Sequence, residues 1–187
     1  MECVEPIKDV ESIKNIRRVL GKSSQRDLLL FVLGINTGIR ISDLLTLKLS
    51  DVWEKGQIKE FLCLYDDKRE EEDIYYLNSK VREELEKYLA SNPLNEGDYL
   101  FKSQKDDLPI TRQQAYRIIN QAARDAGVLG KIGTHTLRKT FGYHAFRAGV
   151  TISLLMKIFH HYSPSETLKY IGVDKEETKY IRIDVNL

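Results

Sequence analysis

The chain has 187 residues, of which 42% are hydrophobic and 30% are charged, and its formal net charge is only +1. These values exclude a disordered chain and leave room for one domain with a sizeable core. They neither require nor exclude a nucleic-acid partner, because a basic face can coexist with an acidic one.

The two cysteines, Cys3 and Cys63, are too few for a disulfide framework and form no metal-ligand pattern. They favour a reducing, cytoplasmic compartment. The first residues lack the basic start and apolar core of a signal peptide. The longest apolar run, residues 28–33, is too short to span a bilayer.

The first quarter of the chain has helical periodicity. Apolar residues at helical spacing predict a helix over residues 9–20, and a denser apolar pattern predicts a second over 24–36. Gly38 is the expected end of the second helix. A third helix is expected to begin near Ser42, a good N-cap, and to carry Leu44, Leu45 and Leu47.

The character changes after residue 53. Residues 58–64 and 74–77 are rich in aromatic and β-branched side chains, which predicts a small antiparallel sheet. The highly charged residues 66–73 between them are expected to form a long turn, so the register is left open. Trp53 is expected to anchor the start of this sheet against the helices.

Helices are then predicted over residues 79–90 and 111–126, the second with Thr111 and Gln114 at capping-box spacing and Gly127 at its end. Another should run from Gly133 to Gly149, followed by a shorter one with Ile152, Leu155 and Ile158 inward. The sequence predicts a mainly α domain with a small antiparallel β-sheet (α+β).

The last predicted helices contain a tyrosine in a defined place. Ser163-Pro164-Ser165-Glu166 combines an N-cap serine, a proline at the first helical position and a glutamate at the third. Tyr170 should therefore lie about two turns into a short helix. Residues 175–183 are expected to form one more helix.

Four residues suited to phosphate chemistry accompany these elements. Arg40 follows a helix end, and arginine donates two parallel hydrogen bonds to a phosphate. His135 and Arg138 are three apart at a helix start, so they share a face near an anion-attracting helix terminus. Tyr170 can form a covalent phosphoester, and nearby cations would favour its phenolate.

These motifs resemble, in the same order, those of the tyrosine recombinases, the phage-integrase family. Thr37-Gly38-Ile39-Arg40 is similar to the family's first arginine box, and Asp43 falls where the family keeps a buttressing acid. His135-Thr136-Leu137-Arg138 looks like its His-x-x-Arg motif. His161 resembles its third basic position, and residues 167–172 resemble its tyrosine box.

The resemblance implies the tyrosine recombinase catalytic-domain fold and a transesterification that uses neither metal nor other cofactor. Tyr170 would attack the scissile phosphate of double-stranded DNA and form a 3′-phosphotyrosyl link. Arg40 and Arg138 would hold its non-bridging oxygens. His135 would transfer protons and His161 would hydrogen-bond the phosphate. The family's catalytic lysine lies in a hairpin turn, where Lys68 is the best match.

The chain departs from the family pattern in three places. Phe159-His160-His161 replaces the usual Leu-Gly-His, so His160 could compete with His161 for its role. The hairpin is acidic. Only Met1 to Lys8 precede the first predicted helix, so we expect residues 1–187 to form a single integrase-type catalytic domain without the family's N-terminal core-binding domain.

We expect a site-specific DNA recombinase or integrase. Lys139 and Arg147 are candidate DNA-binding residues, and the tail from Val173 to Leu187 is the candidate contact for a tetramer on DNA, with a monomer when free. The alternatives are a DNA-binding remnant that has lost strand exchange and a type IB topoisomerase. A metal site at His144, His160 and His161 is disfavoured because no carboxylate or cysteine accompanies them at ligand spacing.

Overall fold

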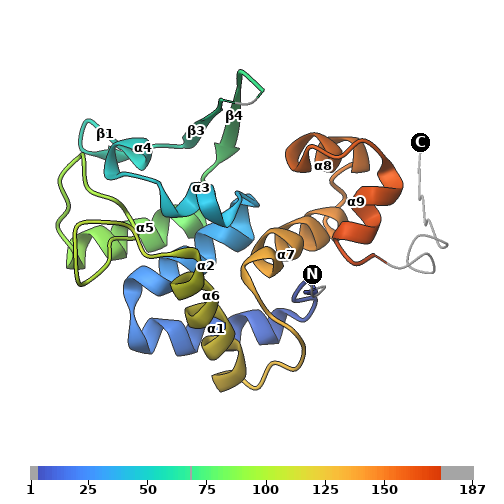
Figure 1. Cartoon of the computed structure of the whole chain (residues 1–187), viewed down its shortest axis with the longest axis horizontal. Helices are drawn as coiled ribbons and strands as arrows, with labels where there is room; N and C mark the ends of the chain where they lie inside the picture. The colour runs from blue at the N-terminus through green and yellow to red at the C-terminus, as the bar shows by residue number, and fades with distance from the viewer. Residues whose placement is uncertain (1–3, 68, 174–187) are drawn as a thin grey trace, which may run out of the picture.

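The computed structural model describes residues 4–67 and 69–173. The helices and strands in these ranges follow the order α1 (Val10–Ser23), α2 (Gln25–Thr37), α3 (Ile41–Leu45), α4 (Leu49–Val52), β1 (Trp53–Glu54), β2 (Gln57–Ile58), β3 (Phe61–Asp66), β4 (Glu71–Tyr76), α5 (Ser79–Ser91), α6 (Arg112–Asp125), α7 (Thr134–Arg147), α8 (Ile152–Phe159) and α9 (Pro164–Tyr170). The predicted class, mainly α with small antiparallel sheets, is confirmed (Figure 1).

Local signals determine most helix ends. The Asp9 side chain caps α1 by accepting from the backbone N–H groups of Glu11 and Ser12. Gly38 ends α2 in the left-handed conformation, with φ +69°, where a β-carbon is unfavourable. The predicted capping box of Thr111 and Gln114 is present at the start of α6. These boundaries follow from side chains that satisfy exposed backbone groups.

The main core surrounds α2, whose residues 28–34 are all buried. Helices α1, α5 and α7 pack around it. The approach of α2 and α7 needs a glycine, because a β-carbon at Gly34 would lie 2.6 Å from Leu137 Cδ1. Arg40, which follows α2, and Arg138 in α7 are therefore held in place by one tightly packed helix pair.

A second, smaller hydrophobic cluster lies at the other end of α7, where α8 and α9 pack. Its buried members are Leu155, Phe159, Ile171 and Val173. We call α8, α9 and this cluster the satellite. In Figure 1 the satellite forms one end of the molecule, beyond the far end of α7.

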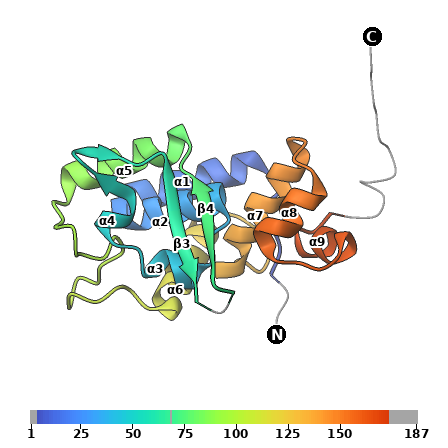
Figure 2. The ribbon, with the colours of Figure 1, turned by 90° about the horizontal axis from the view of Figure 1, so that it is seen from above.

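The β-structure differs from the predicted single sheet. Strands β1 and β2 form one short hairpin, and β3 and β4 form a second, in which Phe61 pairs with Tyr76 and Asp66 with Glu71. Residues 71–73 were predicted to lie in a turn but belong to β4, because alternate side chains of a strand can face solvent and remain charged. The β3–β4 hairpin projects from the helical body (Figures 1 and 2).

The third helix also differs from its prediction. It begins at Ile41, two residues earlier than an N-cap at Ser42 would place it, with Arg40 in the N-cap position and no side-chain cap. It ends at Leu45, so Leu47 is buried in the segment that follows it.

The predicted Trp53 anchor is confirmed, because the half-buried indole packs against the main core. The predicted helix over 175–183 lies outside the described residues.

No helix among the described residues is both long and apolar enough to cross a membrane.

Candidate active site

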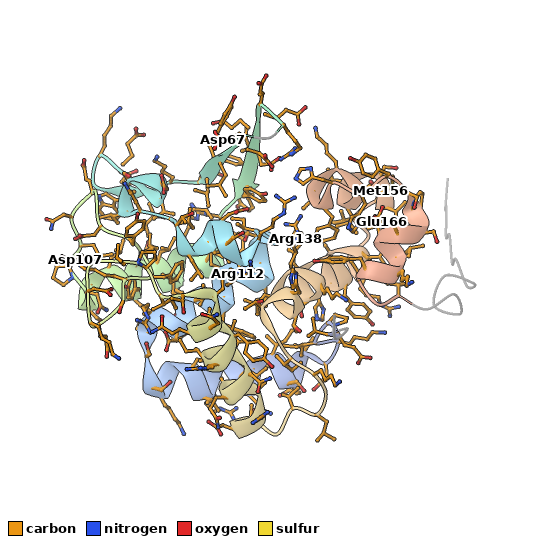
Figure 3. All side chains as sticks on the ribbon, viewed as in Figure 1. Asp67, Asp107, Arg112, Arg138, Met156 and Glu166 are labelled. Atoms are coloured by element: carbon orange, nitrogen blue, oxygen red, sulfur yellow. The ribbon has the colours of Figure 1, made fainter. Side chains whose placement is uncertain are left out.

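Arg138 lies in the second turn of α7 and is 94% buried, with 6% of its surface exposed. Its guanidinium donates hydrogen bonds to the backbone oxygens of Gly38 and, at 2.9 Å, Ile158. It also lies 4.8 Å from the centroid of the Phe159 ring. Burial lowers the pKa of Arg138, but an arginine remains a cation at neutral pH. One buried charge thus joins α2, α7 and α8 (Figure 3).

Arg40 is placed by the chain reversal at Gly38 and stands at the N-terminus of α3. Its side chain is 42% exposed, and its Nη1 lies 3.7 Å from Asp66 Oδ2 of the β3–β4 hairpin. Both Arg40 and Arg138 act to lower the pKa of Tyr75, although burial of that phenol raises it overall. The structure therefore brings the two predicted phosphate-binding arginines to one place, beside Tyr75.

Tyr170 is the last residue of α9, which begins at the predicted Ser163 cap. Its ring centroid lies 5.3 Å from that of Phe159 and 5.0 Å from that of His161. Burial raises the pKa of Tyr170, while Arg138 and Arg40 act to lower it. The two arginines thus favour the phenolate as expected, but burial has the larger effect in the protein without DNA.

The neighbouring histidines take different directions. His161 contacts the Tyr170 ring, and its Nδ1 lies 3.0 Å from Thr167 Oγ1. The Thr167 hydroxyl donates to Ser163 O, so His161 Nδ1 is the donor to Thr167. His160 instead lies 3.3 Å from Asp73 of β4. The structure thus brings His161, and not His160, against the tyrosine.

His135 lies in the first turn of α7 and is exposed. Partial desolvation of its ring by neighbouring atoms, followed by the charges of Arg112, Lys139 and Arg138, lowers its pKa. His135 and Tyr170 line one groove of about 680 Å³. The predicted proton carrier and the predicted nucleophile therefore face the same space.

The two candidate DNA-binding residues lie in different surroundings. Lys139 lines the same groove, donates to Val4 O at 2.8 Å and places its Nζ 5.2 Å from the Tyr170 ring centroid. Arg147 lies at the opposite end of α7, exposed to solvent. Lys131 and Arg124 line the groove as well and were not predicted. Arg124 lies at the end of α6 and Lys131 in the segment before α7. No sequence motif contains both residues, so the sequence did not indicate that they share a groove.

Asp43 and Lys68 are the two predicted residues that remain. The Asp43 carboxylate accepts a hydrogen bond from Ser42 at 3.0 Å and acts to raise the pKa of Tyr75, so it stands at the edge of the arginine pair. Lys68 lies outside the described residues. Arg69, next in sequence, binds the carboxylates of Asp66, Glu71 and Asp73 at 2.6–3.1 Å.

Asp73 and Tyr75 are the two residues of this region that the sequence did not single out. Both lie on the face of β4 opposite the exposed side chains of Ile74 and Tyr76. No signal in the sequence indicates this, because charged Asp73 faces inward while apolar Ile74 is exposed.

Comparison with known proteins supports the resemblance seen in the sequence. The model of the phage integrase family matches residues 7–177. The chain is 40% identical over 179 residues to the probable integrase/recombinase YoeC of Bacillus subtilis, covering 96% of this chain and 95% of YoeC. Against further relatives named tyrosine recombinases, the chain spans 51–58% of the relatives' length.

Solved structures confirm the predicted fold. The crystal structure of XerA recombinase matches with a TM-score of 0.77 at 22% identity, covering 96% of this chain and 63% of XerA. The XerH site-specific recombinase bound to its difH substrate, in a pre-cleavage complex, matches with a TM-score of 0.72 at 21% identity, covering 95% of this chain and 53% of XerH.

Proposed function

The chain belongs to the phage integrase family, and from this premise we propose that it is a tyrosine site-specific recombinase acting on double-stranded DNA. The observation that carries the proposal is the convergence of Arg138, His161 and Tyr170 around the ring of Phe159. Arg40 reaches the same region from the end of α2. A buried cation beside a tyrosine suits the binding of a phosphate diester and its attack by that tyrosine.

The proposed step exchanges one phosphate ester for another. Tyr170 Oη forms a bond to the scissile phosphorus, the bond from phosphorus to the 5′ oxygen breaks, and a 3′-phosphotyrosyl link remains. The phenolic proton passes to a base, for which His135 is the proposed group because it faces the same groove. The departing 5′ oxygen takes a proton from Lys68, the proposed acid of the hairpin turn.

The arginines would stabilise the charge that develops on the non-bridging oxygens. Arg138 is already oriented by two backbone carbonyls, so little reorganisation is needed when a phosphate arrives. Arg40 is paired with Asp66, and a phosphate would replace that carboxylate. Asp43, near Tyr75, is proposed to support this pair of arginines.

In this scheme His161 must be protonated to donate a hydrogen bond to the phosphate. Its Nδ1–H is used on Thr167, so its other ring nitrogen can donate to a phosphate only when the ring is protonated. Burial lowers the pKa of His161 in the protein alone. A bound phosphate would raise it, and DNA binding should therefore take up a proton near neutral pH.

The DNA backbone is proposed to follow the groove beside Tyr170, where Lys139 is one of the basic residues, and to reach Arg147 at the far end of α7. Affinity should fall as salt rises. A tetramer on DNA, held by residues 173–187, and a cytoplasmic location remain our proposals from the sequence.

Covalent trapping tests the proposed reaction. The chain is incubated with a library of nicked duplexes, from which the 5′-hydroxyl fragment diffuses away after cleavage, and the protein–DNA adduct is isolated under denaturing conditions. We expect an adduct with the wild-type chain and none with Tyr170→Phe. Tyr162→Phe is the matched control, because Tyr162 lies in the same segment and is 97% exposed.

Two outcomes would contradict the proposal. An adduct that persists in Tyr170→Phe would remove the nucleophile assignment. The absence of any adduct across the library, with DNA binding retained, would identify a DNA-binding module without strand cleavage. Relaxation of supercoiled plasmid without site preference would instead indicate topoisomerase activity.

A further inference from the structure

His160 adopts a backbone conformation that is unusual for its residue type. It ends α8 with φ +58° and ψ 45°, in the left-handed region. Glycine occupies this region without steric conflict, whereas a residue with a β-carbon does so at a disadvantage. A histidine at this point therefore carries a backbone cost that a glycine would not.

The imidazole of His160 reaches across to the hairpin. Its Nε2 lies 3.3 Å from Asp73 Oδ2, and both side chains are only about one-fifth exposed, at 20% and 23%. Nε2 is buried and forms no aligned hydrogen bond, so it meets Asp73 as a close polar contact that becomes an ion pair only when the ring is protonated. Asp73 is itself fixed, since Arg69 donates to the same oxygen at 2.6 Å.

This contact bridges a gap in the packing. A groove of about 480 Å³ separates β4 from α7 and α8, with Tyr75 and Tyr76 on one side and Leu154 and Lys157 on the other. The hairpin and the satellite are thus not joined by a continuous apolar interface. Figure 2 shows β4 beside α7, with helices α8 and α9 of the satellite next to α7.

We propose that His160 is a positioning residue that clasps the β3–β4 hairpin to the satellite through Asp73. The clasp sets where the tip of the β3–β4 hairpin lies relative to Arg40 and Tyr170. This role rests on the proposed function, because the turn matters only if it serves cleavage. A second contact, between Arg40 and Asp66, holds the same hairpin from the α3 side.

Four proteins test the clasp: His160→Gly, Asp73→Asn, the double variant, and Glu72→Gln as a control. Glycine suits the positive φ, so His160→Gly should not lower the melting temperature. Glu72→Gln removes the same charge from the adjacent, exposed position of β4. The first measurement is amide hydrogen exchange of β3 and β4 in the protein without DNA.

We expect about fivefold faster exchange of the hairpin amides in His160→Gly and in Asp73→Asn, which corresponds to about 1 kcal/mol, and no change in Glu72→Gln. The double variant should exchange no faster than Asp73→Asn alone. Wild-type exchange rates in His160→Gly would overturn the clasp. Additive effects in the double variant would show that the two side chains act separately and would overturn the pairing.

The second measurement is the rate of adduct formation on a substrate selected by trapping. We expect His160→Gly to cleave about fivefold more slowly while its affinity for DNA stays within about twofold of wild type. Faster hairpin exchange with an unchanged cleavage rate would overturn the positioning role. If the wild-type chain forms no adduct at all, the proposed function and the positioning role both fail, while the exchange measurement still decides whether the clasp exists.

Discussion

The main core and the satellite hold the two halves of the candidate site in different ways. The main core encloses α2, with Leu29, Leu30 and Phe31 completely buried, and it extends into α7. Among the described residues, the hydrophobic cluster of the satellite has four buried members, and the other apolar side chains packed against it are only partly buried. Arg138, one of the two arginines proposed to bind phosphate, is therefore fixed by extensive packing, whereas Tyr170 is carried by a small unit. Such a unit can shift or open without unfolding the rest of the domain.

Arg138 is the residue that belongs to both regions, because it donates to Gly38 O in the main core and to Ile158 O in α8. Arg138→Lys should lower the rate of adduct formation by about a hundredfold or more, since lysine keeps the charge but loses the planar fork. It should also reduce the free energy of unfolding by about 2 kcal/mol. Trapping and denaturant unfolding measure the two effects.

The control for this substitution is Arg18→Lys on the exposed surface of α1, which should change neither quantity. A cleavage rate within about threefold of wild type in Arg138→Lys would show that the fork is not needed at the junction of the two regions.

Gly142 determines how closely the satellite approaches α7. A β-carbon at this position would lie 2.5 Å from Ile171 Cγ2 and 2.6 Å from Phe159 Cζ. Gly142→Ala should therefore displace the satellite and cost about 1–3 kcal/mol of stability, with slower cleavage because Tyr170 moves. Thermal unfolding and trapping provide the measurements.

Gly97→Ala is the matched control, because a β-carbon at Gly97 meets no atom within 4 Å. Equal melting temperatures for the two variants would mean that α7 and the satellite repack freely, which would remove the proposed difference between the two regions.

The satellite should also be more sensitive to acid than the main core. Burial lowers the pKa of His160 and of His161 below the ordinary value of 6.5. Asp73 acts against this shift at His160 and Glu166 at His161, while neighbouring arginines reinforce it. A histidine whose pKa is lowered by folding stabilises the native state above its unfolded pKa, and this contribution is lost as pH falls below it.

We therefore expect the free energy of unfolding to decrease between about pH 7 and pH 5.5, by less than the cost of Gly142→Ala. Carboxylates such as Glu83, with a pKa lowered to about 2, act at lower pH and do not contribute in this range. Replacing His160 and His161 by asparagine should flatten the pH dependence. A slope unchanged by both replacements would assign the acid sensitivity to another part of the molecule.

The smallest expected effect concerns the contact between the hairpin and the main core. Asp66 lies 3.7 Å from Arg40 and would compete with a phosphate for that side chain. Asp66→Asn should tighten DNA binding about two- to threefold, in keeping with the modest strength of partly exposed ion pairs. Binding titrations at two salt concentrations measure the effect, with Glu96→Gln as a control for the change in net charge.

The sequence predicted elements well where one side chain satisfies the local backbone. The caps at Thr111 and Ser163 and the glycine at position 38 are of this kind, and each was found as predicted. The predictions failed at α3 and in the hairpin. No side chain caps α3, so the best capping residue nearby, Ser42, was misleading. In the hairpin, charged residues continue into β4 because only one face of the strand is covered.

The sequence by itself determined the class of fold, the family resemblance, and the set of side chains able to bind and attack a phosphate, since these depend on residue type, order and local spacing. Tertiary structure alone decided which of them meet. Gly38 and Ile158 are 120 residues apart in number, yet both bind Arg138. The separate directions of His160 and His161, and the burial that raises the pKa of Tyr170, likewise depend on packing between segments that are distant in the chain.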